Sequence, residues 1–410
     1  LRYLRESARE YGVIERIRYH HRVVQAQWST AEARWTLDIE VTRVDGTEDT
    51  STTSIQMTCA FLYSNTGYYR YDRGHSPDLA GVKNFAGTLI HPQHWPEGFD
   101  VTGKHVAIIG SGATTVTLVP ELARHAASLT QVQRTPTYVA APDSVDAHAS
   151  WLKGRMPSHW IPRVMRTKYI AKAQFTAIAS QFWPERLKRT LRLAAQDRLP
   201  PGYDVAASFQ PPYNPWDQRL CVTPDGDLFK TISAGRARIV TSTIERVLPQ
   251  GLQLSNGHII EADVLITATG FDVLMLGGMT LRVDGRTIDP GEAIAFRGVM
   301  LSGVPNFAFT MGATATSWTL TSDLAAIYVC RVLAHLHRRG YRRVTPTLPA
   351  ESAVWRTTPL FRYSSSYVRR SETLLPSQGD RRSWQMSEHY VAALLRMKYW
   401  PISHPDLTFD

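Results

Sequence analysis

The stretch Lys104-His-Val-Ala-Ile-Ile109 is followed directly by Gly110-Ser-Gly112-Ala-Thr-Thr115, and this junction decides the fold. Its first part is a short apolar run, which is typical of a strand buried on both faces of a parallel sheet. Residues 114–124 then show helical periodicity, and residues 129–133 have the pattern of a second strand. This order predicts a β-α-β unit, and the alternation of strands and helices along the chain predicts an α/β fold.

The loop between the first strand and the helix has the properties of a dinucleotide-binding turn. Its first glycine permits a tight turn, and its second lets the backbone approach a pyrophosphate, whose charge the helix N-terminus stabilises. Thr115 takes the third position, where glycine or alanine is usual. The strand-turn-helix context favours a nucleotide site over a merely tight turn. We predict that these residues bind the cofactor: Gly110, Ser111, Gly112, Ala113 and Thr114.

The end of the second strand distinguishes between the two nicotinamide cofactors. An NAD site carries Asp or Glu there, to bond the ribose 2′-hydroxyl. This chain has Arg134-Thr135 instead, with Arg134 placed 24 residues after Gly110. A guanidinium prefers the 2′-phosphate of NADPH. Arg134 and Thr135 are therefore predicted to bind NADPH, the alternative being a solvated arginine at a strand end.

Composition sets wider limits. The 410 residues suffice for two or three domains, and 43% hydrophobic residues indicate a globular protein. The net charge of +10 is spread along the chain, which favours a basic enzyme that attracts phosphate-bearing ligands over a nucleic-acid binder. Cys59, Cys221 and Cys330 form no C-x-x-C pair, so we expect no metal site and a reducing, cytoplasmic location. No apolar stretch is long enough for a membrane span, and no signal peptide opens the chain.

A more specific signal lies upstream in Phe85-Ala-Gly87-Thr-Leu-Ile-His91-Pro-Gln-His94-Trp95-Pro96. It matches F-x-G-x-x-x-H-x-x-x-W-P, and on this motif the chain resembles the Baeyer-Villiger and related class B flavoprotein monooxygenases. The matched positions are Phe85, Gly87, His91, Trp95 and Pro96. The resemblance implies that His91 belongs to a hinge between flavin and NADPH domains and has a structural and gating role.

Further segments resemble the same family in order along nearly the whole chain. They are residues 68–72, 91–97, 110–114, 133–138, 213–221 and 317–320. The implied fold is a flavoprotein with two Rossmann-like dinucleotide-binding domains. Residues 1–84 would be the remainder of the N-terminal part of the FAD domain, and residues 85–269 the NADPH domain with a helical insertion at about 150–200. Residues 270–410 would complete the FAD domain.

Individual residues acquire roles from this resemblance. Thr66-Gly67 and Thr269-Gly270 would mark the crossings between domains, and Trp318 would lie near the isoalloxazine. Arg219 would stabilise the flavin peroxide and the bound nicotinamide as a fixed cation. The alternative for Arg219 is a salt bridge, for example to Asp217.

The activity implied is that of an FAD- and NADPH-dependent monooxygenase. NADPH reduces FAD, O₂ adds to give a C4a-peroxyflavin, and the peroxide inserts one oxygen into a ketone, or its hydroperoxide form oxygenates a soft sulfur or nitrogen. Trp95-Pro96 favours the Baeyer-Villiger reaction over an N- or S-oxygenating flavin-containing monooxygenase. The expected substrate is a small apolar ketone or a thioamide-type compound. A disulfide oxidoreductase is disfavoured because the chain has no redox cysteine pair.

FAD binding is less well supported by the sequence than NADPH binding. The family carries a first β-α-β unit with its own G-x-G-x-x-G for the ADP half of FAD, and this sequence contains no second such motif. We therefore expect an N-terminally incomplete form of the family. The alternative from another class is a non-catalytic NADPH-binding remnant that cannot hold FAD.

The region from about Trp160 to Arg192 is rich in arginine and aromatic residues. Basic amphipathic helices of this kind can lie on anionic membranes, so a weak peripheral membrane association is one interpretation. The family resemblance instead makes the region a wall of the substrate channel.

Overall fold

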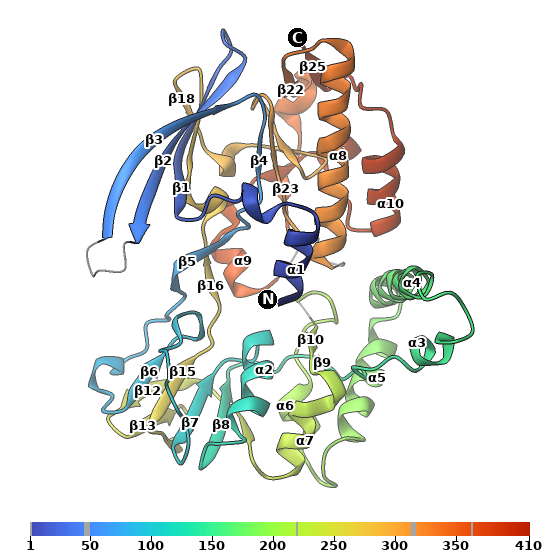
Figure 1. Cartoon of the computed structure of the whole chain (residues 1–410). Coiled ribbons are helices and arrows are strands. Elements are labelled where there is room, and N and C mark those ends of the chain that lie inside the picture. Colours follow the sequence, from blue (N-terminus) through green and yellow to red (C-terminus); the bar gives the residue numbers. More distant parts are fainter. Residues whose placement is uncertain (1, 45–49, 219, 313–316, 362–363) are drawn as a thin grey trace.

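Two bodies joined by a narrow pair of strands make up the protein, as a computed structural model shows for residues 2–44, 50–218, 220–312, 317–361 and 364–410. The lower body in Figure 1 comprises the described residues of 75–270, and the upper body those of 2–68 and 274–410. Strands β5 (Tyr69–Gly74) and β16 (Phe271–Val273) pair antiparallel between them. The chain therefore passes from the upper body to the lower one and returns beside its own outgoing strand.

A five-stranded parallel sheet of order β11-β8-β7-β15-β6 forms the centre of the lower body. Its strands are β6 (Thr88–Ile90), β7 (His105–Ile109), β8 (Ser128–Gln133), β11 (Arg238–Thr241) and β15 (Val264–Thr267). Helix α2 (Ala113–Leu122) connects β7 to β8. The predicted β-α-β unit is confirmed, with boundaries within two residues of those expected.

Both faces of this sheet are covered, as the apolar run in β7 predicts. Ile108 packs into a core with α2, α5 (Pro184–Gln196), α6 (Val205–Phe209) and α7 (Asp227–Ser233). Ala107 and Ile109 point the other way, into a core with the antiparallel strands β12 (Ile244–Leu248), β13 (Gly251–Leu254) and β14 (Ile259–Glu261). Alternate side chains of one strand thus enter two cores, as the period of a strand requires.

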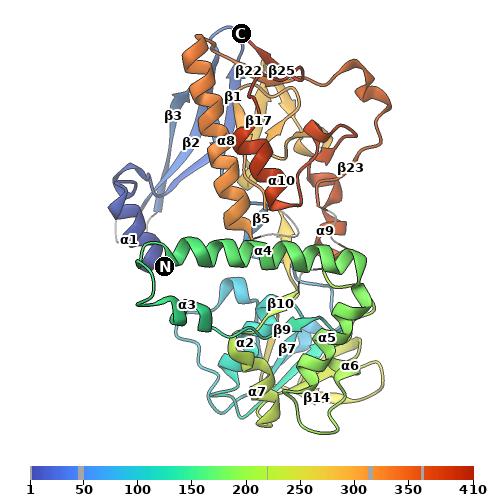
Figure 2. The same cartoon turned by 90° about the vertical axis from the view of Figure 1, so that its right-hand side faces the viewer.

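Helices occupy the region that the sequence marks as arginine- and aromatic-rich. They are α3 (Ala147–Leu152), α4 (Ile161–Phe182) and α5. Figure 2 shows α4 as a bar across the molecule at the level where the two bodies meet. In the part of the chain that the structure describes, no helix is long and apolar enough to cross a membrane.

The upper body is built around a mixed sheet of order β18-β17-β1-β2-β3. Its strands are β1 (His21–Ser29), β2 (Arg34–Val44), β3 (Thr50–Cys59), β17 (Thr280–Val283) and β18 (Arg286–Ile288). Its helices are α1 (Arg2–Glu10), α8 (Trp318–Arg339), α9 (Ser366–Arg370) and α10 (Tyr390–Leu394). The remaining strands are β9 (Val139–Ala140) and β10 (Cys221–Val222) in the lower body, and β19 (Ala295–Phe296), β20 (Met300–Leu301), β22 (Val344–Pro346), β23 (Thr358–Pro359), β24 (Ser377–Gln378) and β25 (Leu407–Phe409) in the upper body.

One sequence expectation is wrong in the upper body. The apolar run 55–64 predicts a single strand, but the chain breaks after β3 and continues as β4 (Leu62–Ser64), which pairs in parallel with β21 (Phe307–Phe309). The buried Asn306 causes the break, because its side-chain amide donates to Ala60 O at 2.8 Å and its backbone carbonyl accepts from Leu62 N at 2.9 Å. These bonds turn the backbone away from β2 and toward β21.

Candidate functional site

The turn after β7 contains two glycines with different surroundings. Gly110 has φ of +142°, and a Cβ atom on it would lie 2.4 Å from Ala268 O, so only glycine fits. Gly112, the residue before α2, has φ of −81°, and a Cβ on it would meet nothing within 4 Å. The first glycine is therefore required by packing, whereas the second leaves space in front of a helix N-terminus, where an anionic ligand is stabilised.

Thr115 fills the third position of the motif without disturbing it. Its side chain is fully buried, and its Oγ1 would lie 2.9 Å from a Cβ on Gly110. Because Gly110 has no Cβ, the larger threonine still allows α2 to pack on the sheet through Val116 and Val119. The departure from the usual glycine or alanine is thus compatible with the dinucleotide-binding turn.

A cleft of about 180 Å³ lies at the carboxyl ends of three neighbouring strands. Thr114 reaches it from the first turn of α2, Gly270 from the segment after β15, and His91 from the segment after β6. The strand order reverses beside β7, since β8 and β11 lie on one side of it and β15 and β6 on the other. Ligands of open α/β sheets bind at such a switch point, so the cleft is the candidate site.

His91 connects the segments that surround this cleft. Its Nε2 donates to Gly270 O at 3.3 Å, while its Nδ1 accepts from Gln93 N at 3.2 Å. Burial lowers the pKa of His91, which favours the neutral ring that these two bonds require. A Cβ on Gly74 would lie 1.9 Å from the imidazole, so the ring lies directly on the end of β5. Thr269 adds a second link, because its Oγ1 donates to the carbonyl of His75 at 2.6 Å.

The other fingerprint residues make packing contacts. A Cβ on Gly87 would lie 2.2 Å from Asp263 O, at the start of β15, so this glycine lets β6 approach its neighbour. Phe85 packs on the core beneath β13, and Trp95 meets Phe99 edge-on with ring centroids 6.2 Å apart. The carbonyl of Pro96 accepts from Phe99 N. The motif therefore fastens the first strand of the lower sheet in place.

Arg134 and Thr135 follow β8 directly, next to the glycine turn. Gly110 N donates to Val132 O at 2.9 Å, which places Arg134 two residues beyond a direct contact of the turn. The Arg134 side chain is exposed, and among the described residues no hydrogen bond or ion pair holds its guanidinium. It is therefore available to an anionic group of a ligand in the turn.

The proposed cation Arg219 lies outside the described residues, but the loop before it is placed. Asp217 O accepts from Ser364 N and Oγ at 3.0 and 3.1 Å, which ties the loop to the upper body. The Asp217 carboxylate accepts from Asn214 N at 2.9 Å. Trp216 has φ of +75°, a strained conformation for a residue other than glycine. The loop thus bridges the two bodies near the candidate site.

The upper body has a glycine in a comparable position, at the end of β21. A Cβ on Gly312 would lie 2.2 Å from the ring of Trp318, at the start of α8. Trp318 in turn packs on Tyr68, with ring centroids 5.1 Å apart, and the hydroxyls of Tyr68 and Tyr69 are 3.2 Å apart. Burial raises the pKa of Tyr68 far above its usual value. This aromatic cluster beside the joining strands was not predicted, and its only sequence signal is the aromatic pair after Thr66-Gly67.

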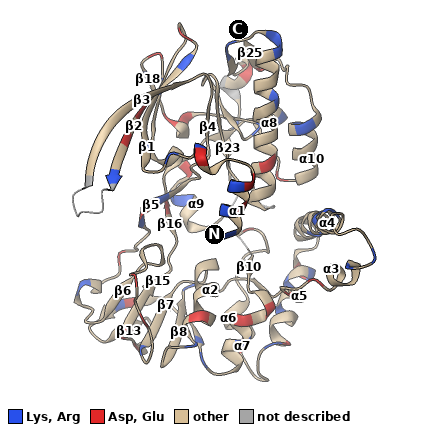
Figure 3. Ribbon diagram, viewed as in Figure 1, with Lys and Arg blue, Asp and Glu red and all other residues tan. Residues whose placement is uncertain are grey.

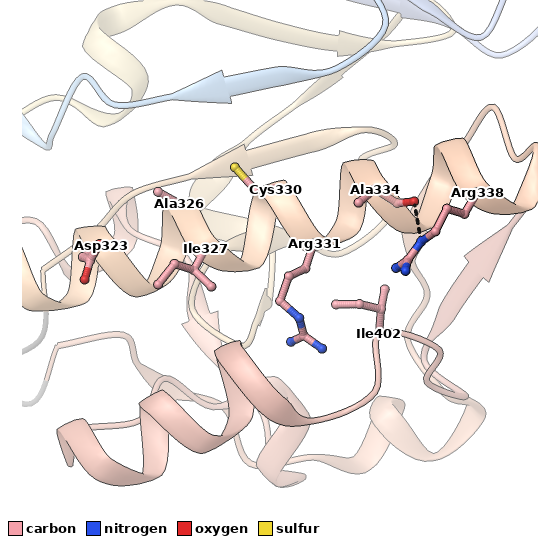
Figure 4. A pocket seen from close by; sticks show the side chains of 8 residues that line it. All are labelled: Asp323, Ala326, Ile327, Cys330, Arg331, Ala334, Arg338 and Ile402. Atoms are coloured by element: carbon pink, nitrogen blue, oxygen red, sulfur yellow. Dashed lines mark hydrogen bonds between the residues drawn. The ribbon is translucent and has the colours of Figure 1, made fainter. Parts of the chain in front are cut away.

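A larger cleft, of about 570 Å³, lies elsewhere on the upper body (Figure 4). It runs along α8 beside Ile402 and contains none of the predicted site residues. Arg331, which projects into it, donates to the carbonyls of Met397 and Trp400 and so fastens the chain after α10. In the described ranges, no group of three or more His, Cys, Asp or Glu side chains is placed to hold a metal ion.

Comparisons with known proteins agree with this geometry. Residues 1–152 match the family model described as flavin-binding monooxygenase-like. The chain is 40% identical over 410 residues to the FAD-containing monooxygenase EthA of Mycobacterium tuberculosis, covering 100% of this chain and 82% of EthA. A crystal structure of OTEMO in complex with FAD and NADP matches with TM-score 0.70 at 20% identity, covering 100% of this chain and 84% of that one. An open crystal structure of cyclohexanone monooxygenase matches with TM-score 0.69 at 16% identity, covering 100% of this chain and 83% of that one.

Proposed function

The chain belongs to the family of FAD-containing monooxygenases, and we propose that it uses NADPH to insert one oxygen of O₂ into a small apolar ketone. The observation that carries the NADPH part is the open space at Gly112, directly before helix α2 at the switch point of the parallel sheet. The ketone part rests on the Baeyer-Villiger fingerprint around His91 and on the fold that the chain shares with cyclohexanone monooxygenase, which is named for a ketone.

NADPH fits the described residues. Its pyrophosphate would lie on the turn from Gly110 to Thr114, where backbone N–H groups at the start of α2 have no partner within the helix. Arg134 would bind the 2′-phosphate through charge-assisted hydrogen bonds, with Thr135 beside it. The nicotinamide would extend toward Gly270 and His91. In this arrangement the chain's own residues bind the cofactor and orient its reactive end toward the upper body.

FAD fits only in part. The parallel strands β4 and β21 point at the junction of the two bodies. Gly67 and Gly312 each follow one of these strands by three residues, and Trp318 begins α8. The sequence contains no second glycine-rich strand-turn-helix motif for the ADP half of FAD. The Trp318 ring occupies the space beside Gly312, so this glycine does not leave room for a pyrophosphate. When bound, FAD would supply the activation of O₂ that is its chemistry in this family.

The hinge around His91 has a gating role in this proposal. The neutral imidazole holds Gly270, which follows β15, and lies on Gly74 at the end of β5. Any rotation of one body against the other must bend β5 and β16, so it also moves these contacts. His91 would thereby transmit the relative position of the bodies to the nicotinamide end of the cleft. Arg219, which lies outside the described residues, remains the proposed cation that stabilises the bound nicotinamide.

Titration and absorption measurements on the 410-residue chain test the proposal. NADPH should quench the intrinsic fluorescence with saturation, and NADH should bind more weakly. After incubation with FAD and removal of the free cofactor, a visible flavin band together with oxidation of NADPH and lactone formation from cyclohexanone would support the whole proposal. A product from methyl phenyl sulfide but none from the ketone would favour the N- or S-oxygenating alternative. NADPH binding with no flavin band would favour the non-catalytic remnant, and absence of NADPH binding would overturn the cofactor assignment.

A further inference from the structure

We propose that the outward face of α4, together with α5, binds an anionic lipid surface, so that the protein lies on a membrane without crossing it. This inference does not depend on the proposed reaction. It rests on three features of the described helices: a stripe of exposed apolar side chains, a concentration of positive charge, and the attachment of the opposite face of α4 to the rest of the molecule.

The apolar stripe follows the helical period. Trp160, Val164, Ala171, Phe175, Ile178 and Phe182 are spaced by four, seven, four, three and four residues, which places them on one face of α4. All six are exposed, and Phe175 and Phe182 retain 68% and 70% of their accessible surface. Trp183, at the junction with α5, is 50% exposed. A row of large exposed apolar side chains on one helix marks an interaction surface more often than isolated ones do.

The opposite face of α4 is fastened to its neighbours. Arg166 forms an ion pair with Asp323 of α8 at 3.0 Å, and Ala177 and Ser180 are buried. Gln174, at the edge of the stripe, accepts from Tyr390 N through its Oε1 at 3.1 Å. The helix is therefore held with a fixed orientation, and the stripe faces away from the ion pair and from the buried residues. Figure 2 shows α4 in front of both bodies with no element crossing over it.

Positive charge is concentrated in the same helices. Residues 147–196 contain ten lysines and arginines and one acidic residue, Glu185, so they carry nine of the chain's ten net positive charges. Arg163 and Lys172 flank the stripe on its two sides, and both are exposed. The blue segments of α4 and α5 in Figure 3 belong to this basic region. An apolar stripe edged by basic side chains complements a bilayer whose headgroups carry negative charge.

Two exposed tryptophan rings each lie beside an arginine guanidinium, an arrangement that suits the headgroup region of a lipid bilayer. The guanidinium of Arg163 lies 5.2 Å from the ring of Trp160, and that of Arg155 lies 4.8 Å from the ring of Trp151. Both tryptophans are exposed. Amphipathic rings are favoured at membrane interfaces, and the long basic side chains can reach phosphate groups from there. With its basic residues, α4 is too polar to span a bilayer, which leaves binding in the interface plane.

Flotation with lipid vesicles tests the inference on the purified 410-residue chain. We expect flotation with vesicles that contain phosphatidylglycerol and little with pure phosphatidylcholine, and we expect added salt to weaken it. The double variant Phe175→Ser/Phe182→Ser should reduce the fraction bound at low lipid by about tenfold or more, because two apolar anchors are lost. Arg163→Glu/Lys172→Glu should reduce it by a similar factor and weaken the salt dependence.

Matched controls separate this face from the rest of the surface. Lys83→Glu/Arg236→Glu makes the same change in charge at exposed positions outside the helical region, and Leu89→Ser removes an exposed leucine from the edge strand β6. These variants should bind vesicles like the parent chain, and unchanged melting curves would show that all variants are folded. Absence of flotation with anionic vesicles would overturn the inference. Concentration-dependent dimerisation, or oligonucleotide binding, that Phe175→Ser/Phe182→Ser abolishes while flotation persists unchanged would also overturn it.

Discussion

Gly112 in the lower body and Gly312 in the upper body occupy comparable places, since each follows a strand that ends at the junction of the two bodies. Their surroundings differ: a Cβ on Gly112 would meet open space, whereas a Cβ on Gly312 would lie 2.2 Å from the Trp318 ring. Helix α2 begins immediately after Gly112, but α8 begins only at Trp318. The difference favours the proposed ligand site at Gly112, where a helix N-terminus with free N–H groups follows at once.

The largest expected effect comes from Gly110→Ala. Its φ of +142° and the carbonyl oxygen of Ala268 at 2.4 Å leave no room for a side chain. We expect the free energy of unfolding to fall by about 3 kcal/mol, since backbone strain and overpacking act together. Urea denaturation followed by circular dichroism measures this, and NADPH binding should be lost as well.

Gly112→Ala is the matched control for that experiment. Its φ of −81° suits alanine and its Cβ would touch nothing, so stability should stay within about 0.5 kcal/mol of the parent. NADPH should nevertheless bind at least about tenfold more weakly, because the methyl group would stand where the pyrophosphate approaches the backbone. Unchanged NADPH affinity in a folded Gly112→Ala variant would contradict the proposed position of the pyrophosphate.

The second largest effect should be seen with Gly312→Ala. The new methyl group would push on the Trp318 indole, which is held against Tyr68, so we expect a loss of about 2 kcal/mol in unfolding free energy. NADPH affinity should not change, in contrast to Gly112→Ala. Adding Trp318→Leu to Gly312→Ala should recover part of the lost stability in a double-mutant cycle. If the changes in unfolding free energy caused by Gly312→Ala and Trp318→Leu simply add, the indole does not occupy the space beside Gly312.

Arg134→Gln tests whether the lower body binds the 2′-phosphate that distinguishes NADPH from NADH. Removal of charge-assisted bonds to a 2′-phosphate should weaken NADPH binding by about tenfold to a hundredfold, while NADH binding stays nearly constant. Because Arg134 is exposed, stability should be unaffected. Arg124→Gln, at an exposed arginine just after the far end of α2, is the control and should change neither affinity. An equal loss of NADPH and NADH affinity would show that Arg134 does not bind the 2′-phosphate.

The lower body was predictable because its signals are local. The apolar run of β7, the glycine turn and α2 are contiguous in sequence, and each supports the others. The upper body depends on contacts between distant residues: Asn306 breaks the strand run 55–64, and β1 pairs with β17 more than 250 residues away. No periodicity records such contacts. The same holds for the site, where residues 85–96 and 110–115 were found as motifs, but the packing of Gly74 on His91 arises only from the fold.

The smallest predicted effect concerns the pH dependence of the joining segment. Burial lowers the pKa of His91 below the 6.5 of a free histidine, so the folded protein resists protonation that the unfolded chain accepts. Its contribution to stability is therefore complete above this value and is lost as the pH falls through 6.5 toward the folded pKa. Burial also lowers the pKa of His335 and of His404, so the stability of the parent chain depends on pH even without His91. The pH profile of the parent must therefore be compared with that of a His91 variant.

His91→Gln isolates the contribution of His91. A glutamine amide can still donate to Gly270 O but does not titrate, so the loss of stability between neutral and mildly acid pH should be smaller in the variant than in the parent. Urea denaturation at several pH values on both sides of 6.5 measures this difference. Identical pH profiles would show that the ring is not held neutral by its contacts with Gly74 and Gly270. In that case the gating role of His91 would have to be abandoned.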